Sequence, residues 1–241
     1  MNSYSFIFIS LFAGVLAGLV LASINYFVAE PFMDQAIEIE VENSITEGEV
    51  IDSDELSVYR IWQKEGTFVA GALFGLTYGA ILGIVFVFAR RYLPSSDDRK
   101  KALILAGLMC LTLYVIPFLK YPANPPAVGD PETIAIRDSL YTGFQLASGL
   151  IILGLSVFWF KFKTISLFKY LIPAFYVGLI GLVFYIFPAN PDPMTLPIDL
   201  VNSFRMVTFT TMIMFYLVLG IVFGVIWYRY KPHEATRLTT S

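Results

Sequence analysis

Charged residues are scarce in this sequence. Asp, Glu, Lys and Arg together make up 15% of the 241 residues, whereas hydrophobic residues make up 57%. Soluble domains have about 25% charged and about 45–50% apolar residues. The excess of apolar side chains needs a solvent other than water, which excludes an ordinary soluble domain. The basic residues do not make the large positive patch that holds nucleic acid, so we expect no nucleic-acid partner.

Residues of the kind that carry out catalysis are nearly absent. The chain has one cysteine, Cys110, and one histidine, His233, so no intramolecular disulfide can form. The phosphate-binding pattern G-x-x-x-x-G-K-S/T, the zinc-protease pattern H-E-x-x-H and the pair C-x-x-C are all missing. We therefore expect that the protein is not an enzyme and that it holds no permanently bound cofactor.

Long apolar runs are abundant. Crossing a hydrocarbon core of about 30 Å takes about 20 helical residues, and lipid offers no partner to unpaired backbone groups, so helices are favoured. The sequence therefore predicts an all-α integral membrane protein, with one transmembrane domain over residues 1–241 built as a bundle of about six transmembrane helices. The predicted spans are residues 6–29, 67–89, 102–119, 139–160, 170–187 and 206–228.

Charges of opposite sign are placed on alternate connections between these spans. Of the 16 Lys and Arg residues, 11 fall on one set of connections, and by the positive-inside rule this set is cytoplasmic. We therefore predict a multi-pass protein of the plasma or inner membrane with both termini in the cytoplasm. The basic residues concerned are Arg90, Arg91, Arg99, Lys100, Lys101, Lys161, Lys163, Lys169, Arg229, Lys231 and Arg237.

The opposite connections carry 16 of the 19 Asp and Glu residues. Residues 30–66 are predicted to be an acidic extracytoplasmic loop, and residues 229–241 a short cytoplasmic tail. Pro31 is expected to end the first helix, because proline has no N–H to donate, and a short amphipathic helix is expected around residues 54–64. If the first helix continued past Pro31, then Glu30, Asp34 and Glu38 would share one face.

A short repeat links the other two acidic connections. The run YPANP at residues 121–125 resembles FPANP at residues 187–191, and an arginine follows each copy, Arg137 or Arg205, near the start of the returning span. This pattern suggests parallel repeated hairpins, an arrangement known in transporters, with three parallel helical hairpins as one form of the bundle. Two independent helix-stop signals would give the same pattern. We expect the two arginines to pair with acids such as Asp138 and Asp199, or to reach toward the membrane interface.

Glycine spacing gives the clearest packing signal. Gly71, Gly75, Gly79 and Gly83 fall four residues apart on one face of the second span, and small residues at this spacing let two helices approach closely. We expect this helix to lie at the centre of the bundle. Among the polar residues inside the spans, Asn25 and Gln145 stand out; each is expected to hydrogen-bond a neighbouring helix.

Carboxylates near the repeated turns are the candidate metal ligands, because oxygen donors suit hard and borderline divalent cations. The alternative is an acidic rim that is simply solvated. The candidate metal residues are Asp130, Glu132, Asp138, Asp192 and Asp199.

Three segments of the chain resemble the CbtA family of predicted cobalt transporter subunits. They are residues 12–20 (FAGVLAGLV), followed by Glu30-Pro31 and an acidic stretch; residues 122–129 (PANPPAVG); and the closing helix from Phe204-Arg205 to Gly224. The resemblance implies a membrane component of a cobalt uptake system, partnered with a small histidine-bearing B subunit that would supply imidazole to the metal. The family is usually described with about five spans, whereas this sequence predicts six.

Two functions remain open from the sequence. In the first, the chain is a membrane subunit of an uptake transporter for cobalt or another divalent transition metal. The acidic outer face would attract the ion, its substrate, to a path between the hairpins near the glycine-lined helix. In the second, it is a non-transporting scaffold subunit whose glycine faces dock other subunits of a larger membrane complex. The lipid bilayer is a partner in both cases.

Overall fold

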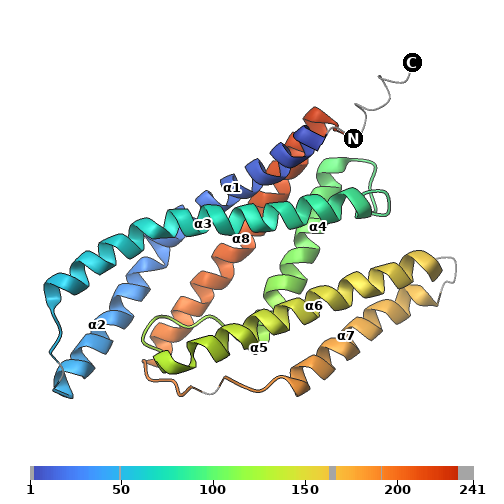
Figure 1. Cartoon of the computed structure of the whole chain (residues 1–241). Helices are drawn as coiled ribbons and strands as arrows, with labels where there is room; N and C mark the ends of the chain where they lie inside the picture. Colours follow the sequence, from blue (N-terminus) through green and yellow to red (C-terminus); the bar gives the residue numbers. More distant parts are fainter. Residues whose placement is uncertain (1–2, 49, 163–166, 191, 233–241) are drawn as a thin grey trace.

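The protein is built from helices. The computed structural model describes residues 3–48, 50–162, 167–190 and 192–232, and in these ranges every regular element is a helix (Figure 1). The predicted all-α class is therefore confirmed. Five helical stretches are long and apolar enough to cross a membrane, and α7 adds a shorter apolar stretch, Tyr170–Ile186. These correspond to the six predicted spans. Lys163 and residues 233–241, with His233, lie outside the described residues.

Helices α1 (Ser3–Val28) and α3 (Ser53–Ala89) pack along their glycine faces. A Cβ atom added to Gly14 would overlap the backbone carbonyl of Gly75, and one added to Gly18 would overlap that of Gly71. The two backbones are in van der Waals contact, so the predicted close packing is confirmed. Since α1 covers the glycine face of α3, that face is not free to line a path through the membrane.

The main core lies among α1, α3, α4 (Asp98–Cys110) and α8 (Ile198–Tyr230). In this core α8 packs against both α1 and α4. The glycine-lined helix α3 packs on α1 and also contacts α8 through its aromatic rings. Buried aromatic rings fill the interior: Phe86 on α3 lies 5.1 Å from Phe223 and 5.0 Å from Trp227, between ring centroids. Such rings bury large apolar areas in edge-to-face geometry. Cys110 is buried in the same core.

The third span is one helix with a distortion in the middle. The α-helical part α4 passes into a π-helical turn, η1 (Leu111–Val115), and returns to α-helix in α5 (Ile116–Lys120). Pro117 explains part of this change, because it has no N–H to donate to the carbonyl of Leu113 four residues earlier. That carbonyl instead accepts a hydrogen bond of 2.6 Å from Gln145 Nε2 on a neighbouring helix. The distortion therefore couples the third span to the fourth.

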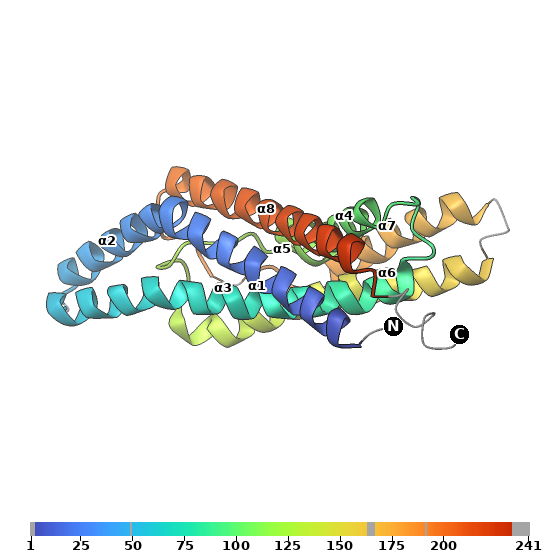
Figure 2. The same cartoon turned by 90° about the horizontal axis from the view of Figure 1, so that it is seen from above.

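Helices α6 (Ile134–Phe162) and α7 (Phe168–Ile186) form a pair at one side of the core. In Figure 1 they lie side by side below α3 and α4, and Figure 2 shows them extending to one side of α8. α6 contacts η1 and α5, whereas α7 packs mainly on α6. The last sequence hairpin, α7 followed by α8, is thus open, and the bundle is not three closed hairpins.

Residues 30–66 are helical rather than a loop. α2 (Glu30–Thr46) begins directly after α1, and Pro31 lies in its first turn, where a missing N–H is tolerated. The first helix does end beside Pro31, at Val28, as expected, but a second helix starts at once because Pro31 falls in its first turn. Asp52 caps the start of α3 by accepting from the N–H groups of Asp54 and Glu55, and the helix then runs on without a break. The short helix expected at 54–64 is the first part of α3.

An ion-pair network joins α2 to α3. Arg60 Nη2 lies 2.7 Å from Glu30 Oε2 and 2.7 Å from Asp34 Oδ1, and Lys64 Nζ lies 2.8 Å from Asp34 Oδ2. The side chains of Arg60 and Glu30 are 11% and 7% exposed. Glu30 and Asp34 lie on one face of α2, as expected if residues 30–38 are helical. Their carboxylates are engaged by the side chains of Arg60 and Lys64 on α3.

The same network lowers the pKa of the Asp34 carboxyl. Partial burial acts to raise its pKa, but hydrogen bonds from Lys64 and Arg60 outweigh it, so the pKa lies below the ordinary value of 3.8. A lowered folded-state pKa stabilises the fold above the ordinary value, and this stabilisation is lost as pH falls through the folded value. The α2–α3 contact is thus intact at neutral pH and weakens only in acid below about pH 4.

We expect Arg60→Met to loosen the α2–α3 contact. The change leaves the Glu30 carboxylate buried without a cation, which costs about 3–5 kcal/mol for a buried pair. Hydrogen exchange of the α2 amides should therefore speed up by at least about 100-fold, since 1.36 kcal/mol is a factor of ten. Lys64→Met is the control, because its partner Asp34 is half-exposed and such pairs contribute about 1 kcal/mol or less. Equal exchange in both variants would contradict this assignment.

The two ends of the bundle differ in charge. One end carries the start of α1, the end of α8 and the α3–α4 connection, and the other carries α2 and the two repeated turns (Figures 1 and 2). At the first end Arg90 Nε and Nη2 bind both oxygens of Asp98 at 2.8 and 2.6 Å. The guanidinium of Arg99 also lies over the ring of Tyr228, 4.5 Å from its centroid. These contacts fix the basic end of α3, α4 and α8.

Candidate functional site

The two repeated turns lie side by side at the acidic end. We call residues 121–130 turn 1 and residues 187–197 turn 2; Pro191, the last residue of the second repeat copy, lies outside the described residues. The first residue of each copy, Tyr121 or Phe187, packs against the buried ring of Phe144 on α6, with centroid distances of 5.9 and 5.5 Å. Tyr121 OH also donates to the carbonyl of Pro188 at 2.6 Å. Burial raises the pKa of the Tyr121 hydroxyl above its ordinary value.

Arg137 lies on α6, the helix that follows turn 1, and its side chain contacts turn 2. Its Nε lies 3.0 Å from Asp192 Oδ2, and its Nη1 and Nη2 donate to the backbone carbonyls of Val128 and Asp130 at 3.0 and 3.1 Å. The Asp192 carboxylate is 4% exposed and also accepts from Thr133 Oγ1 at 2.7 Å. This pair fixes the start of α6 against turn 2.

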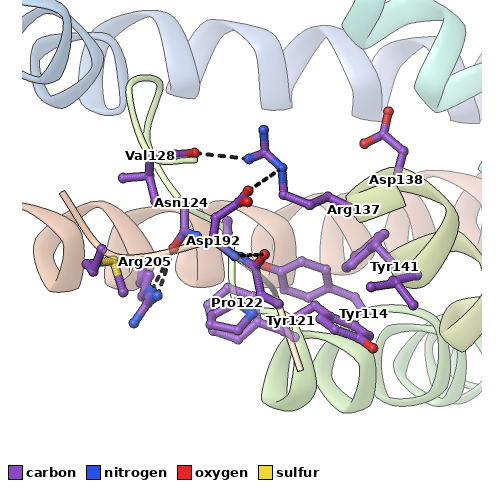
Figure 3. A pocket seen from close by; sticks show the side chains of 15 residues that line it. Tyr114, Tyr121, Pro122, Asn124, Val128, Arg137, Asp138, Tyr141, Asp192 and Arg205 are labelled. Carbon is purple, nitrogen blue, oxygen red and sulfur yellow. Dashed lines mark hydrogen bonds and ion pairs between the residues drawn. The ribbon is translucent and has the colours of Figure 1, made fainter. Parts of the chain in front are cut away.

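Arg205 makes the reciprocal contact, from the helix after turn 2 to turn 1. Its Nη2 and Nε donate to Asn124 Oδ1 at 2.7 and 3.3 Å (Figure 3). Each repeat arginine therefore binds the turn of the other repeat. The expected pairing of the arginines with Asp138 and Asp199 is wrong; the partners are Asp192 and Asn124, because the two turns are packed against each other.

Gly129 is needed where turn 1 meets this ion pair. Its φ of +95° lies in the left-handed region that L side chains rarely adopt. A Cβ atom at this position would overlap Asp192 Oδ2 and would lie 2.9 Å from Arg137 Nη1. The last residue of the PANPPAVG segment is therefore a glycine for two reasons, backbone conformation and the close approach of the Arg137–Asp192 pair.

A cavity of about 360 Å³ opens between the turns and the ends of the third, fourth and last spans. Its walls carry two arginines and two aspartates, so the formal charges cancel, and tyrosine and asparagine side chains supply further polar groups. In Figure 3 Arg205 and Asp138 lie at opposite sides of the group. The polar lining residues are Tyr114, Tyr121, Asn124, Arg137, Asp138, Tyr141, Asn190, Asp192 and Arg205.

The five candidate metal carboxylates are only partly brought together. Asp138 and Asp192 line the cavity. Asp130 is exposed and caps the short helix η2 (Pro131–Thr133) by accepting from the N–H of Glu132 at 2.8 Å, and Glu132 itself is exposed. Asp199 is exposed in the first turn of α8. Within the part of the chain that the structure describes, no three His, Cys, Asp or Glu side chains are grouped to hold a metal ion.

Polar groups continue from the cavity into the span region. Tyr114, two helical turns below Tyr121, donates to the carbonyl of Thr208 on α8 at 3.1 Å. Gln145 Nε2 donates to Tyr78 OH at 2.8 Å, in addition to the carbonyl of Leu113. The expected interhelical role of Gln145 is thus confirmed. The tyrosines were missed from the sequence, although tyrosine inside an apolar run near Pro117 is a signal that could have pointed to them.

Asn25, the other polar residue singled out in the spans, behaves differently. Its Oδ1 is buried and has no hydrogen-bond partner among the described residues. This oxygen therefore accepts no hydrogen bond from a neighbouring helix.

Comparison with known proteins shows the family of this chain. The family model described as probable cobalt transporter subunit (CbtA) matches residues 3–228, nearly the whole chain. No curated protein and no solved structure matches the chain.

Proposed function

Since this chain belongs to the family of probable cobalt transporter subunits (CbtA), we propose that it is the membrane subunit through which cobalt, or a similar divalent transition-metal ion, is taken up. It is a membrane protein and a transporter subunit. What we propose is that the metal is cobalt or a similar ion, that it moves inward, and that it passes through this chain.

The observation that best supports this route is the cavity at the acidic end. It opens between the two repeated turns, has a volume of about 360 Å³ and leads to Tyr114 and Tyr141 on the adjoining helices. A polar cavity among the spans of a helix bundle is where such proteins usually bind their ligands. The glycine face of α3, by contrast, is filled by α1.

We propose different roles for the five candidate carboxylates. Asp138 lines the cavity without an ion-pair partner within 4 Å in the described residues, and it is the carboxylate placed to contact the metal. Asp192 is engaged by Arg137 and Thr133 and positions the turns. The exposed Asp130, Glu132 and Asp199 attract the cation by their field, as an acidic outer rim does. The metal is a substrate here, and no permanent cofactor is proposed.

The orientation proposed from the sequence places the acidic end outside the cell, in the plasma or inner membrane, with both termini in the cytoplasm. The segregation of charges on alternate connections supports it. Labelling of intact cells with a membrane-impermeant thiol reagent tests it. A Glu47→Cys variant should react and an Arg91→Cys variant should not; the reverse would overturn both the orientation and the proposed way in for the metal.

A transporter subunit implies partner subunits, and we propose that one is the small histidine-bearing B subunit implied by the family resemblance. Asp138 alone does not provide the nitrogen donors that borderline divalent metals favour, so a partner imidazole would complete the ligand set. On α7, Gly178 and Gly181 have open space where a Cβ would be built, which leaves room for another helix to pack closely.

Uptake of radioactive cobalt tests the transport proposal directly. Cells without other cobalt importers, expressing this chain together with its partner subunit, should accumulate the metal. Asp138→Asn should reduce that uptake, whereas Asp199→Asn, equally exposed but outside the cavity, should have little effect. If the protein copurifies in a stable complex but uptake never rises above background, the scaffold function is favoured instead.

A further inference from the structure

We propose that the cavity between the turns binds the divalent cation as a complex with a small carboxylate chelator, and not as the bare ion. This inference rests on the transport function proposed above. Its first support is the charge of the walls: Arg137 and Arg205 balance Asp138 and Asp192. A bare dication gains little from a site of zero net charge, whereas a metal–carboxylate complex offers positive charge to Asp138 and negative charge to the two arginines.

The donor set is also insufficient for a bare ion. Asp192 already contacts the Arg137 guanidinium and the Thr133 hydroxyl, which leaves Asp138 as the cavity carboxylate able to reach a metal. The described residues contain no group of three His, Cys, Asp or Glu side chains suited to metal binding. Divalent cations take about six ligands, so most donors have to arrive with the ion.

Arg205 provides the charge that a chelator would recognise. A guanidinium has five N–H donors, but in the described residues Arg205 side-chain donors bind only the neutral Asn124 Oδ1, and no carboxylate lies within 4 Å. Its positive charge is therefore not neutralised at the cavity wall. Arginine binds carboxylates through two parallel hydrogen bonds, which suits a chelator carboxylate lying across the cavity from Asp138.

The volume of the cavity fits the same ligand. The cavity measures about 360 Å³, room for more than a single ion. Cavities of about 300–1,000 Å³ are usual for small-molecule ligands, and this one lies at the lower end of that range.

Asn124→Asp is the decisive variant. It keeps the oxygen that accepts from Arg205 and adds a negative charge that neutralises the guanidinium, so it removes the anion-binding charge without removing the contact. Asn190→Asp is the matched control, because it adds the same charge to the same cavity at the equivalent repeat position, where the side chain accepts from the N–H of Asp192.

Binding is measured by titration calorimetry on the full chain in lipid nanodiscs, with cobalt–citrate, cobalt chloride and citrate as separate ligands. We expect cobalt–citrate to bind at least tenfold more tightly than either component. Asn124→Asp should weaken that binding at least tenfold and Asn190→Asp less than threefold. Unchanged thermal unfolding of Asn124→Asp would confirm that its fold is intact.

Three results would overturn the inference: cobalt alone binding as tightly as the complex, citrate alone binding as tightly, or equal losses in the two Asn→Asp variants. Uptake assays separate this failure from failure of the transport function. If cobalt uptake is equal with and without citrate, the chelate proposal fails and transport stands. If no form of cobalt is taken up, the transport function itself fails.

Discussion

Gly75→Ala is expected to destabilise the protein by about 3 kcal/mol, at the upper end of the range for overpacked cores. The added Cβ would overlap the Gly14 carbonyl group and would lie 3.0 Å from Gly18 Cα. Both are backbone atoms, so no side chain can rotate away, and α1 and α3 have to separate along their whole seam. Thermal unfolding in mild detergent should show a large decrease in the midpoint temperature.

The control for this prediction is Gly181→Ala on α7. Nothing lies within 4 Å of the Cβ that would be added there, and alanine favours helix over glycine by about 1 kcal/mol. The midpoint temperature of this variant should stay the same or rise. If Gly75→Ala unfolds at the same temperature as the control, the helices are not in backbone contact at this seam.

Asp192→Asn is expected to reduce cobalt uptake by about tenfold or more. Asp192 is the ion-pair partner of Arg137 and is 4% exposed, and removing one member of a buried pair typically costs about 3–5 kcal/mol. The turns would then lose the contact that holds α6 against turn 2. Radioactive uptake at equal amounts of protein in the membrane measures the effect.

The double variant Arg137→Gln with Asp192→Asn distinguishes an unpaired charge from a missing carboxylate. Removing both partners leaves no buried charge, so it should restore part of the uptake lost in Asp192→Asn alone. If the double variant is as impaired as the product of the two single variants, the two residues act independently. The role we give to their pairing would then be wrong.

The spans were predictable because the physics that selects them is local. About 20 apolar residues satisfy their own backbone as a helix, whatever their neighbours are, and the residues of α1, α3 and α8 show this pattern directly. The helix α2 was missed for a local reason as well. Proline stops a helix when it falls in the interior, but Pro31 falls in the first turn of α2, where the N–H groups have no intrahelical acceptor and nothing is interrupted.

The pairing of the repeat arginines could not be predicted in the same way. Spacing shows that Arg137 and Arg205 occupy equivalent places after the two turns, but not that each contacts the opposite turn. That depends on how Tyr121 and Phe187 both pack on Phe144, a tertiary contact between segments that are far apart in the sequence. The acids nearest in sequence, Asp138 and Asp199, were therefore the wrong partners, although Asp138 does line the cavity.

The uninterrupted length of α3 has a practical consequence. At 37 residues the helix is about 55 Å long, whereas the hydrocarbon core is about 30 Å thick, so one rigid rod runs from the membrane interior to the connection with α2. Small membrane proteins give few features for aligning particles in electron cryomicroscopy. A soluble domain grafted at that connection, and carried by α2 and α3 together, would move in step with the embedded bundle and could serve as a fiducial.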